Sequence, residues 1–477
     1  MNVLFVASEL APFAKTGGLA DVMAALPPYL HRAGHDVRVV VPLYDTIDTS
    51  KARFEAIFDV EFPLGTHRYA MKVFRVGVAP PIYFLHCPAL YHRGRLYTSQ
   101  PDEHRRFLAL AFGALLTCQQ LGFVPDIIHA HDWQAALLPM IVKTIFAGEL
   151  ARTRTLLTIH NLNYQGSFPA TVVPDTNLAP RSHLFHQDLL TAGRINFLLQ
   201  GILFADGVST VSPTYASEIQ TAEHGAGLDG FLRARSSTVV GILNGVDYDE
   251  WSPERDRHIS HRFSAEDLSG KARNKAVLLA SLGLPYDAGV PVIGVVSRLV
   301  GQKGFRLFEP TMFELLRRHR FQLVVLGSGE PALEDLFARL QRSFPRQVCF
   351  YQGFKNDLAH LIEAGADMFV MPSRYEPCGL NQMYSLRYGT VPIVHRTGGL
   401  ADTVELWNPR TGRGTGFVFD HHDEAGLRWA IEAALVTYRD RGQWRRLVQN
   451  GMAKDFSWDT QGKLYELVYD RLLASRR

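Results

Sequence analysis

The chain has 477 residues and carries 50 Lys and Arg against 47 Asp and Glu, a formal net charge of +3. One hydrophobic core stops growing beyond roughly 250–300 residues, so we expect two domains. The near-neutral balance excludes a whole-protein field for gripping nucleic acid, and no apolar stretch reaches the roughly 18 residues of a membrane span.

The cysteines Cys87, Cys118, Cys349 and Cys378 lie far apart and form no CxxC pair. This spacing disfavours a zinc ribbon or a thioredoxin-type site. The opening segment MNVLFVASELAPF lacks a basic region and a long apolar core, so we interpret it as a buried strand and not as a signal peptide. We therefore expect a reduced, cytoplasmic protein.

Short apolar runs rich in Val and Ile recur along the chain without alternating with polar residues, which is typical of strands buried on both faces of a parallel sheet. Helical patterns lie between many of them, such as the apolar face within residues 19–30. Strand alternating with helix indicates a doubly wound α/β architecture. The predicted strands are Val3–Val6, Val37–Val41, Ile82–Leu85, Thr155–Ile159, Val239–Leu243, Pro291–Val296, Gln322–Leu326, Met368–Met371 and Val391–Val394.

The composition of the chain changes from apolar to polar near Ile242–Val246. Asn244-Gly245 is a strong turn signal there, and a segment rich in Arg, Asp, His and Ser follows to about residue 271. We expect the domain boundary at this turn. The last helix has an apolar face that can pack on either domain, formed by Leu464, Leu467, Val468 and Leu472.

Two loops share nearly the same sequence, KTGGLAD at residues 15–21 and RTGGLAD at residues 396–402. Each follows an apolar run and opens a helical pattern. Glycines let backbone N–H groups approach an anion, a helix N-terminus adds partial positive charge, and Lys15 adds a full one. We interpret the first loop as facing a phosphate; the alternative is a plain tight turn between strand and helix.

The segments SRLVGQKG and SRYEPCGL each follow a predicted strand. In the first, Arg298 and Lys303 flank Gly301, which suits a diphosphate held without metal; the alternative is a solvated pair on a surface turn. In the second, Glu376 precedes an expected helix start, where a carboxylate can accept sugar hydroxyls while N–H groups hold phosphate. The alternative for Glu376 is an ordinary acid at a helix start.

Histidines end two apolar runs: HAHD at residues 129–132 ends an Ile-Ile run, and His160 ends the predicted strand Thr155–Ile159. His129 and His131 share one strand face, as in some metal hydrolases, but neutral histidines lining a sugar pocket fit as well. The GSG at residues 327–329 lacks the third glycine of a dinucleotide fingerprint. The DYD at residues 247–249 matches a metal-holding triplet, but it lies in the expected linker.

Taken together, these motifs resemble those of the bacterial glycogen synthases and plant starch synthases, a glycosyltransferase family. The resemblance covers nearly the whole chain and is carried by eight motifs in order. They are KTGGLADV at 15–22, HAHDW at 129–133, TIHNLNYQG at 158–166, TVSPTYA at 210–216, LNGVD at 243–247, SRLVGQKG at 297–304, SRYEPCGL at 373–380 and RTGGLADTV at 396–404.

The resemblance implies the GT-B architecture, in which two Rossmann-like domains face a deep cleft. It implies an acceptor-side domain at residues 1–243, a donor-side domain at 244–455 and a helix at 456–477 that crosses back to the first domain. It further implies glucose transfer, with retention, from ADP-glucose to the non-reducing end of an α-1,4-glucan such as glycogen, releasing ADP. No cofactor and no metal are expected.

Site residues carry over where this sequence matches the family's motifs. The implied catalytic residues are Glu376, His160, Arg298 and Lys303. The implied donor-binding residues are Lys15, Gly17, Gly18, Asp21, Asn244, Arg298, Lys303, Phe354, Cys378, Gly379 and Leu380, with Phe354 where an aromatic ring, often Tyr, stacks on adenine. Of the DYD triplet only Asp247 belongs to the family pattern. Residues 100–107 and 190–201 follow the family pattern only loosely.

We find no obvious nucleophile for a double displacement. The hypothesis is attack from the leaving-group face, with cations stabilising the departing diphosphate and His160 and Glu376 positioning the sugar. Three alternatives stay open: a related GT-B glucosyltransferase using UDP-glucose or another acceptor, a non-catalytic glucan-binding relative, and a metal hydrolase built on HAHD.

Overall fold

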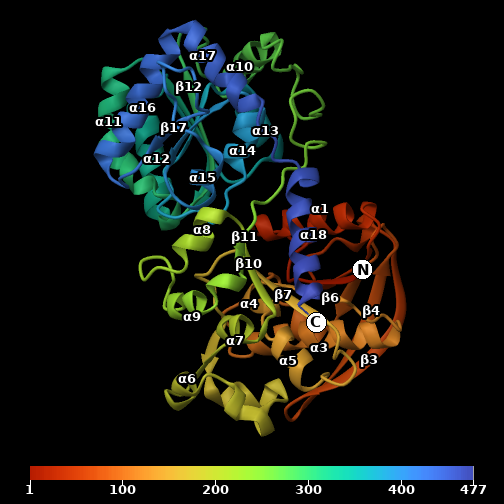
Figure 1. The fold of residues 1–477 in the computed structure, drawn as a ribbon. Coiled ribbons are helices and arrows are strands. Elements are labelled where there is room, and N and C mark those ends of the chain that lie inside the picture. Colours follow the sequence, from red (N-terminus) through yellow and green to blue (C-terminus); the bar gives the residue numbers. More distant parts are fainter. Residues whose placement is uncertain (476–477) are drawn as a thin grey trace. The chain divides into compact units, whose positions relative to one another are not determined.

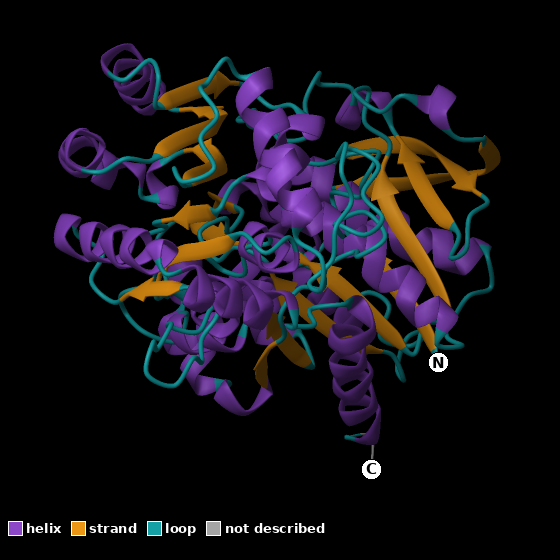
Figure 2. Ribbon diagram, turned by 90° about the horizontal axis from the view of Figure 1, so that it is seen from above, coloured by secondary structure: helices purple, strands orange, loops and turns teal. Residues whose placement is uncertain are grey.

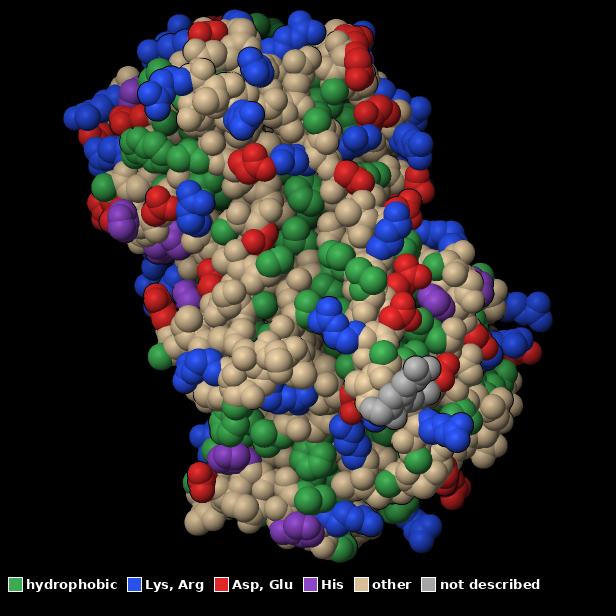
Figure 3. All heavy atoms as spheres, viewed as in Figure 1, with side chains coloured by type: hydrophobic (Ala, Val, Ile, Leu, Met, Phe, Trp, Pro, Cys, Tyr) green, Lys and Arg blue, Asp and Glu red, His purple; other side chains and the backbone are tan. Residues whose placement is uncertain are grey.

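The computed structural model describes residues 1–475, which divide into two α/β units. The first unit comprises Met1–Gly245 and the chain from Trp458 onward, and the second comprises Val246–Ser457. Figure 2 shows strands lying between helices, as expected of doubly wound folds. On the face drawn in Figure 3, Lys and Arg are interspersed with Asp and Glu, in keeping with the small net charge.

The first unit is built on a nine-stranded sheet in the order β11-β10-β7-β6-β1-β2-β5-β4-β3. Neighbours pair in parallel except where β4 joins β5 and β3. The strands are β1 (Asn2–Val6), β2 (Asp36–Pro42), β3 (Phe54–Leu64), β4 (His67–Val76), β5 (Ile82–His86), β6 (Ile127–His131), β7 (Arg154–Ile159), β10 (Gly207–Thr210) and β11 (Val239–Gly241), with β8 (Ser167–Pro169) and β9 (Arg194–Asn196) in a separate pair.

The helices of the first unit lie between its strands in sequence, except the last, which follows the second unit. They are α1 (Gly18–Arg32), α2 (Pro88–Tyr91), α3 (Glu103–Gln120), α4 (Asp132–Ala135), α5 (Leu138–Thr144), α6 (Gln187–Thr191), α7 (Phe197–Phe204), α8 (Pro213–Glu218), α9 (Asp229–Ala234) and α18 (Trp458–Ala474). The strand order reverses beside β1, whose neighbours are β2 and β6. Ligands of doubly wound sheets bind at such a reversal, outside the carboxyl ends of the strands.

The second unit has six parallel strands in the order β14-β13-β12-β15-β16-β17, the arrangement of a dinucleotide-binding sheet, with its reversal between β12 and β15. The strands are β12 (Val292–Leu299), β13 (Gln322–Gly329), β14 (Val348–Gln352), β15 (Met368–Met371), β16 (Val391–His395) and β17 (Phe417–Phe419). The helices are α10 (Ser269–Ser281), α11 (Phe308–Arg318), α12 (Pro331–Ser343), α13 (Asn356–Gly365), α14 (Asn381–Arg387), α15 (Gly398–Thr403), α16 (Glu424–Arg439) and α17 (Arg441–Met452).

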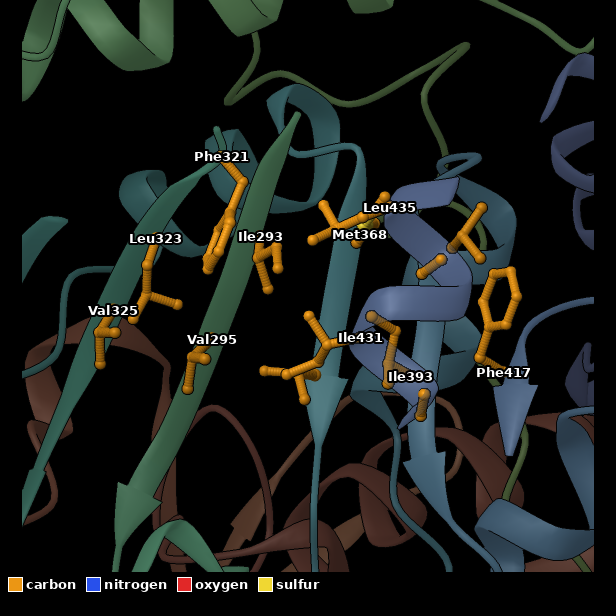
Figure 4. Packing of buried hydrophobic residues seen from close by; sticks show 14 of the residues in the cluster. Ile293, Val295, Phe321, Leu323, Val325, Met368, Ile393, Phe417, Ile431 and Leu435 are labelled. Atoms are coloured by element: carbon orange, nitrogen blue, oxygen red, sulfur yellow. The ribbon is translucent and has the colours of Figure 1, made fainter. Parts of the chain in front are cut away.

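Every predicted apolar run is a strand, although Val239–Leu243 stays in the sheet only to Gly241. Burial on both faces explains the continuous runs, because helices cover each side of the parallel strands. Figure 4 shows the core on one side of the second sheet, where Ile293 and Val295 of β12 point toward Ile431 and Leu435 of α16. No helix within residues 1–475 is both long and apolar enough to span a bilayer.

Helix α18 belongs to the first unit and lies beside α1 (Figure 1). The Tyr29 hydroxyl donates to Glu466 Oε2 at 2.8 Å, and His35 Nε2 lies 3.1 Å from Glu466 Oε1. Gly462 lets the helices approach closely, because a Cβ there would overlap the Tyr29 ring.

The predicted apolar face of this helix is wrong in part. Leu464 and Leu467 are 42% and 60% exposed, whereas Tyr465 and Tyr469 are fully buried. The helix turns its aromatic side toward the unit because the Tyr469 hydroxyl lies 2.7 Å from His129 Nδ1, a polar contact that a leucine could not make. Leu472 is buried, as predicted.

Replacing Gly462 with Val tests the close packing of α18 on α1. The added side chain must displace the Tyr29 ring, so we expect the first unit to lose about 1–3 kcal/mol of unfolding free energy. Urea denaturation measures the loss. Lys463→Ala, on the exposed side of the same turn, is the matched control, and equal stability of the two variants would contradict the assigned packing.

Candidate active site

The loop after β1 is organised by a buried carboxylate. Glu9, 4% exposed, accepts hydrogen bonds from Thr16 N and Thr16 Oγ1, both at 2.6 Å, and from Gly17 N at 3.2 Å. The Tyr97 hydroxyl also donates to Glu9, at 2.6 Å. Sequence analysis predicted a phosphate-facing loop, but two of its N–H groups are already satisfied by the chain's own anion.

Lys15 stands at the outer side of this loop. Its ammonium lies 2.6 Å from Asp21 Oδ1, and its side chain is 52% exposed. A Cβ added to Gly17 would meet no atom within 4 Å, so the backbone there is open to approach. Gly18 begins α1. The surface that this loop offers to a ligand is therefore the Lys15 ammonium and the open flank of Gly17, not the N–H groups of Thr16 and Gly17.

Two histidines meet at the carboxyl ends of β6 and β7. His131 Nδ1 lies 3.0 Å from His160 Nε2, and His160 N donates to Asp132 Oδ1 at 2.7 Å. Asp132 has φ of 53°, a left-handed conformation rare outside glycine. Burial lowers the pKa of His160 to about 3 and raises the pKa of Asp132 to about 7. His160 is therefore neutral at physiological pH and suited to hydrogen bonding with an uncharged ligand.

His129 is not available as a metal ligand. Its Nδ1 lies 2.7 Å from the Tyr469 hydroxyl and its Nε2 lies 2.5 Å from Thr158 Oγ1. Within residues 1–475 no three His, Cys, Asp or Glu side chains gather as a metal-binding group. The HAHD motif thus forms a buried network with His160, and neither His129 nor His131 is exposed.

Asn244 lies close beyond β11, at the end of the first unit. It is 4% exposed, and its Oδ1 has no hydrogen-bond partner within residues 1–475. A buried amide oxygen without a partner costs about 1–3 kcal/mol, so its place in the fold calls for a ligand or water to satisfy it.

In the second unit, the loops after β12 and β15 are joined by an ion pair. Lys303 Nζ lies 2.6 Å from Glu376 Oε2, and the Ser373 hydroxyl donates to the same oxygen at 2.9 Å. Both charged side chains are mostly buried, at 18% and 7% exposed. Glu376 Oε1 has no hydrogen bond within residues 1–475 and remains the accepting atom.

The backbone holds these two loops in place. Gly304 has φ of 73°, and a Cβ there would overlap the Pro372 carbonyl, so only glycine permits this approach. Arg374 N donates to Gln302 O at 2.9 Å. Arg298, at the carboxyl end of β12, is exposed, and its guanidinium has no hydrogen bond or ion pair within residues 1–475. The same turn is therefore flanked by Lys303, which is held by an ion pair, and by Arg298, which has no ion pair within residues 1–475.

The second glycine loop, at residues 396–402, packs against the loop that carries Glu376. A Cβ at Gly398 would overlap the Glu376 carbonyl and one at Gly399 would overlap the Cys378 carbonyl. Gly399 N donates to Glu376 O at 3.1 Å. The two similar loops thus have different roles. The N–H groups of the first loop bind the Glu9 carboxylate, and the glycines of the second loop pack against the backbone of Glu376 and Cys378.

The remaining predicted residues follow β15 and β14. Cys378 is buried, Gly379 has φ of 71°, and Leu380 is the N-cap of α14. Phe354 is 76% exposed just before α13, so its ring face is open to stacking. Within the second unit these residues share the carboxyl edge of the sheet with Lys303 and its partner.

Glu9 and Ser373 were not predicted as residues that organise the site. Each directly follows a predicted strand, at the edge where ligands bind, and that position was the available signal. The glycines of GSG have a structural cause: Cβ atoms at Gly327 and Gly329 would overlap the carbonyls of Ser297 and Leu299 in the neighbouring strand.

Comparison with known proteins gives family matches to both units. The family described as starch synthase catalytic domain matches residues 2–234, and glycosyl transferases group 1 matches residues 284–451. Glycogen synthase of Koribacter versatilis is 46% identical over 479 residues, 99% of this chain and 98% of that protein. Glycogen synthase of Myxococcus xanthus is 46% identical over 483 residues, 99% of this chain and 100% of that protein.

Solved structures agree with these matches. The catalytic domain of starch synthase IV from Arabidopsis thaliana, bound to ADP and acarbose, is 37% identical with a TM-score of 0.93, and the similarity covers 99% of each chain. Sucrose-phosphate synthase from Thermosynechococcus elongatus is 18% identical with a TM-score of 0.63 over 99% of each chain, a likeness of fold alone.

The buried histidines predict acid sensitivity. Burial lowers the pKa of His129, His131 and His160, so below the ordinary histidine pKa of about 6.5 the unfolded chain binds protons that the native state does not. Stability is therefore complete above that pH and lost as pH falls, by about 1.4 kcal/mol per pH unit for each group.

His131→Asn removes one of these groups, so its unfolding free energy should fall less steeply between pH 6 and 5 than that of the wild type, by roughly one proton's share. Urea unfolding at each pH measures the slope. His183→Asn, at an exposed position, should keep the wild-type slope. Identical slopes for all three proteins would refute the assignment.

Proposed function

Because the chain belongs to the glycogen and starch synthase family of glycosyltransferases, we propose that it transfers glucose from ADP-glucose to the non-reducing end of an α-1,4-glucan and releases ADP. The observation that carries the proposal is the Lys303–Glu376 pair at the strand-order reversal of the second unit. The starch synthase of similar fold is bound to ADP and acarbose, which supports ADP as the released product.

The donor's diphosphate is proposed to lie against Arg298 and Lys303 of the second unit. Negative charge grows on the departing diphosphate as the bond to glucose breaks, and fixed cations stabilise that charge more than they stabilise the bound donor. The adenine is proposed to stack on Phe354, whose ring is open. Gly379 and Leu380 would supply N–H groups at the start of α14.

The glucose is proposed to be held by groups that are neutral or whose charge is already paired. Glu376 Oε2 is engaged by Lys303 and Ser373, which leaves Oε1 to accept a sugar hydroxyl. His160 is neutral, and the buried Asn244 amide oxygen needs a donor that a sugar hydroxyl can supply. When Lys303 turns toward the diphosphate, Glu376 gains accepting capacity for the sugar.

Retention is proposed to follow from attack on the leaving-group face. The proposed site residues offer no obvious nucleophile for a double displacement, because Glu376 is assigned to accepting a sugar hydroxyl and Asp21 is paired with Lys15. A departing phosphate oxygen would take the proton of the acceptor hydroxyl while the new bond forms. The proton and the electron pair of the broken bond then both leave with ADP.

The turnover of variants that lack Lys303 or Arg298 tests the proposed role of these two cations. Lys303→Ala and Arg298→Ala each remove a charge aimed at the leaving group, so we expect kcat at saturating ADP-glucose to fall on the order of 100- to 1000-fold. Arg306→Ala is the matched control, because that side chain is 77% exposed in the same loop and should leave kcat unchanged. Wild-type turnover in both Lys303→Ala and Arg298→Ala would overturn the mechanism.

Donor and metal requirements separate the rival functions. We expect ADP release from ADP-glucose with glycogen present to exceed UDP release from UDP-glucose, and to persist in excess chelator, because protein cations replace a metal. A preference for UDP-glucose would favour another transferase of this architecture. Glycogen binding without transfer would favour a non-catalytic relative, and loss of activity in chelator would favour metal chemistry.

A further inference from the structure

A cavity of about 450 Å³ lies in the second unit at the edge of the sheet opposite to Lys303 and Glu376. Asp367 and Gly389, which line it, precede β15 and β16, so the cavity adjoins the amino ends of the parallel strands. Helices α10, α16 and α17 supply most of the remaining wall. Its volume is within the range of small-molecule sites.

Four cations line this cavity, and only one has a carboxylate partner. Lys275 Nζ lies 2.7 Å from Asp367 Oδ2 and donates to Val290 O at 2.7 Å. Lys271, Arg441 and Arg445 form no ion pair within residues 1–475. Arg441 and Arg445 are exposed to solvent at the cavity and have no carboxylate partner within the described residues, so their guanidiniums are available to an anion, whereas Lys271 already feels the charges of Asp367 and Glu363.

Lys271 is the deepest of the three. Its ammonium donates to Thr390 Oγ1 at 2.6 Å and to the carbonyls of Glu363 and Ala364 at 3.3 Å, all of them neutral oxygens. Burial lowers its pKa to about 7, although the charges of Asp367 and Glu363 act to raise it and that of Lys275 acts to lower it. An anion beside it would favour the charged form.

The acidic residues at the rim do not neutralise these cations. Glu266 accepts from the Ser264 hydroxyl at 2.7 Å, and Asp267 accepts from Ser269 N at 2.9 Å. Both carboxylates are exposed to solvent and serve the turn that precedes α10. The two arginines of α17 therefore have no carboxylate partner among the residues that line the cavity.

Arg441 and Arg445 are four residues apart on α17, so their side chains share one helix face. The Arg441 guanidinium lies 4.3 Å from the centre of the Tyr438 ring, which steadies it at the cavity wall. Two neighbouring guanidiniums match the oxygens of a phosphate group by paired hydrogen bonds. Tyr286, 51% exposed at the rim, offers a ring face to whatever the phosphate carries.

We propose that this cavity binds the phosphate group of a small metabolite, with Arg441 and Arg445 donating hydrogen bonds and Lys271 supplying charge beneath. The source is inorganic phosphate or a phosphate monoester, which share the same dianionic group. The site is separate from the proposed donor site and does not rest on the proposed transferase function, since its residues lie at the other edge of the sheet.

Isothermal titration calorimetry at constant ionic strength tests the site with inorganic phosphate, glucose 6-phosphate and, as uncharged control, glucose. Wild type should bind both phosphates and not glucose. Arg441→Ala and Arg445→Ala should each weaken binding about tenfold or more, because each removes charge-assisted hydrogen bonds. Arg439→Ala, an exposed arginine outside the cavity, should bind as wild type.

Lys303→Ala separates this site from the donor site. Heat that persists in Lys303→Ala and is lost in the double variant Arg441→Ala/Arg445→Ala supports the proposal. Tighter binding of glucose 6-phosphate than of inorganic phosphate would identify a monoester as ligand, and equal binding would identify free phosphate. Absence of heat in wild type up to about 10 mM ligand, or unchanged heat in the double arginine variant, overturns the proposal.

Discussion

The ion pair between Lys303 and Glu376 joins the two loops that flank the strand-order reversal of the second unit. Such a pair is costly to desolvate, and two apolar residues would serve stability as well. We therefore propose that its value is functional: each charge would serve a different part of a nucleotide sugar, and each neutralises the other until that ligand arrives. Ser373 and the glycine at position 304 fix the geometry on which the pair depends.

Most of the parallel framework could be predicted from the sequence, because strands buried on both faces form continuous apolar runs, but strands β10, β14 and β17 were not predicted. The antiparallel hairpin of β3 and β4 was missed, since its residues are partly exposed and lack such a run. The packed face of α18 was mistaken because its tyrosines, not its leucines, are buried. Apolarity alone does not reveal that a hydroxyl has a buried partner, as Tyr469 has in His129.

The candidate site was likewise predicted from the sequence only in part. Motif positions after strands indicated Lys303, Glu376 and His160, because parallel sheets bind ligands at their carboxyl edge. The sequence could not reveal that Glu9 occupies the N–H groups of the first glycine loop. The loops at residues 15–21 and 396–402 therefore have similar sequences but different roles, because their roles depend on contacts with residues distant in sequence. The cavity at the amino edge left no motif, since Lys271 and its neighbours come from separate helices.

The central claim is that Lys303 stabilises the leaving diphosphate in the transition state more than in the bound donor. Separate measurement of the ADP-glucose dissociation constant and the single-turnover rate of ADP release in Lys303→Met tests it most directly. The account predicts a dissociation constant changed less than about tenfold and a release rate lowered on the order of 100- to 1000-fold. A loss confined to affinity, with the release rate intact, would contradict it.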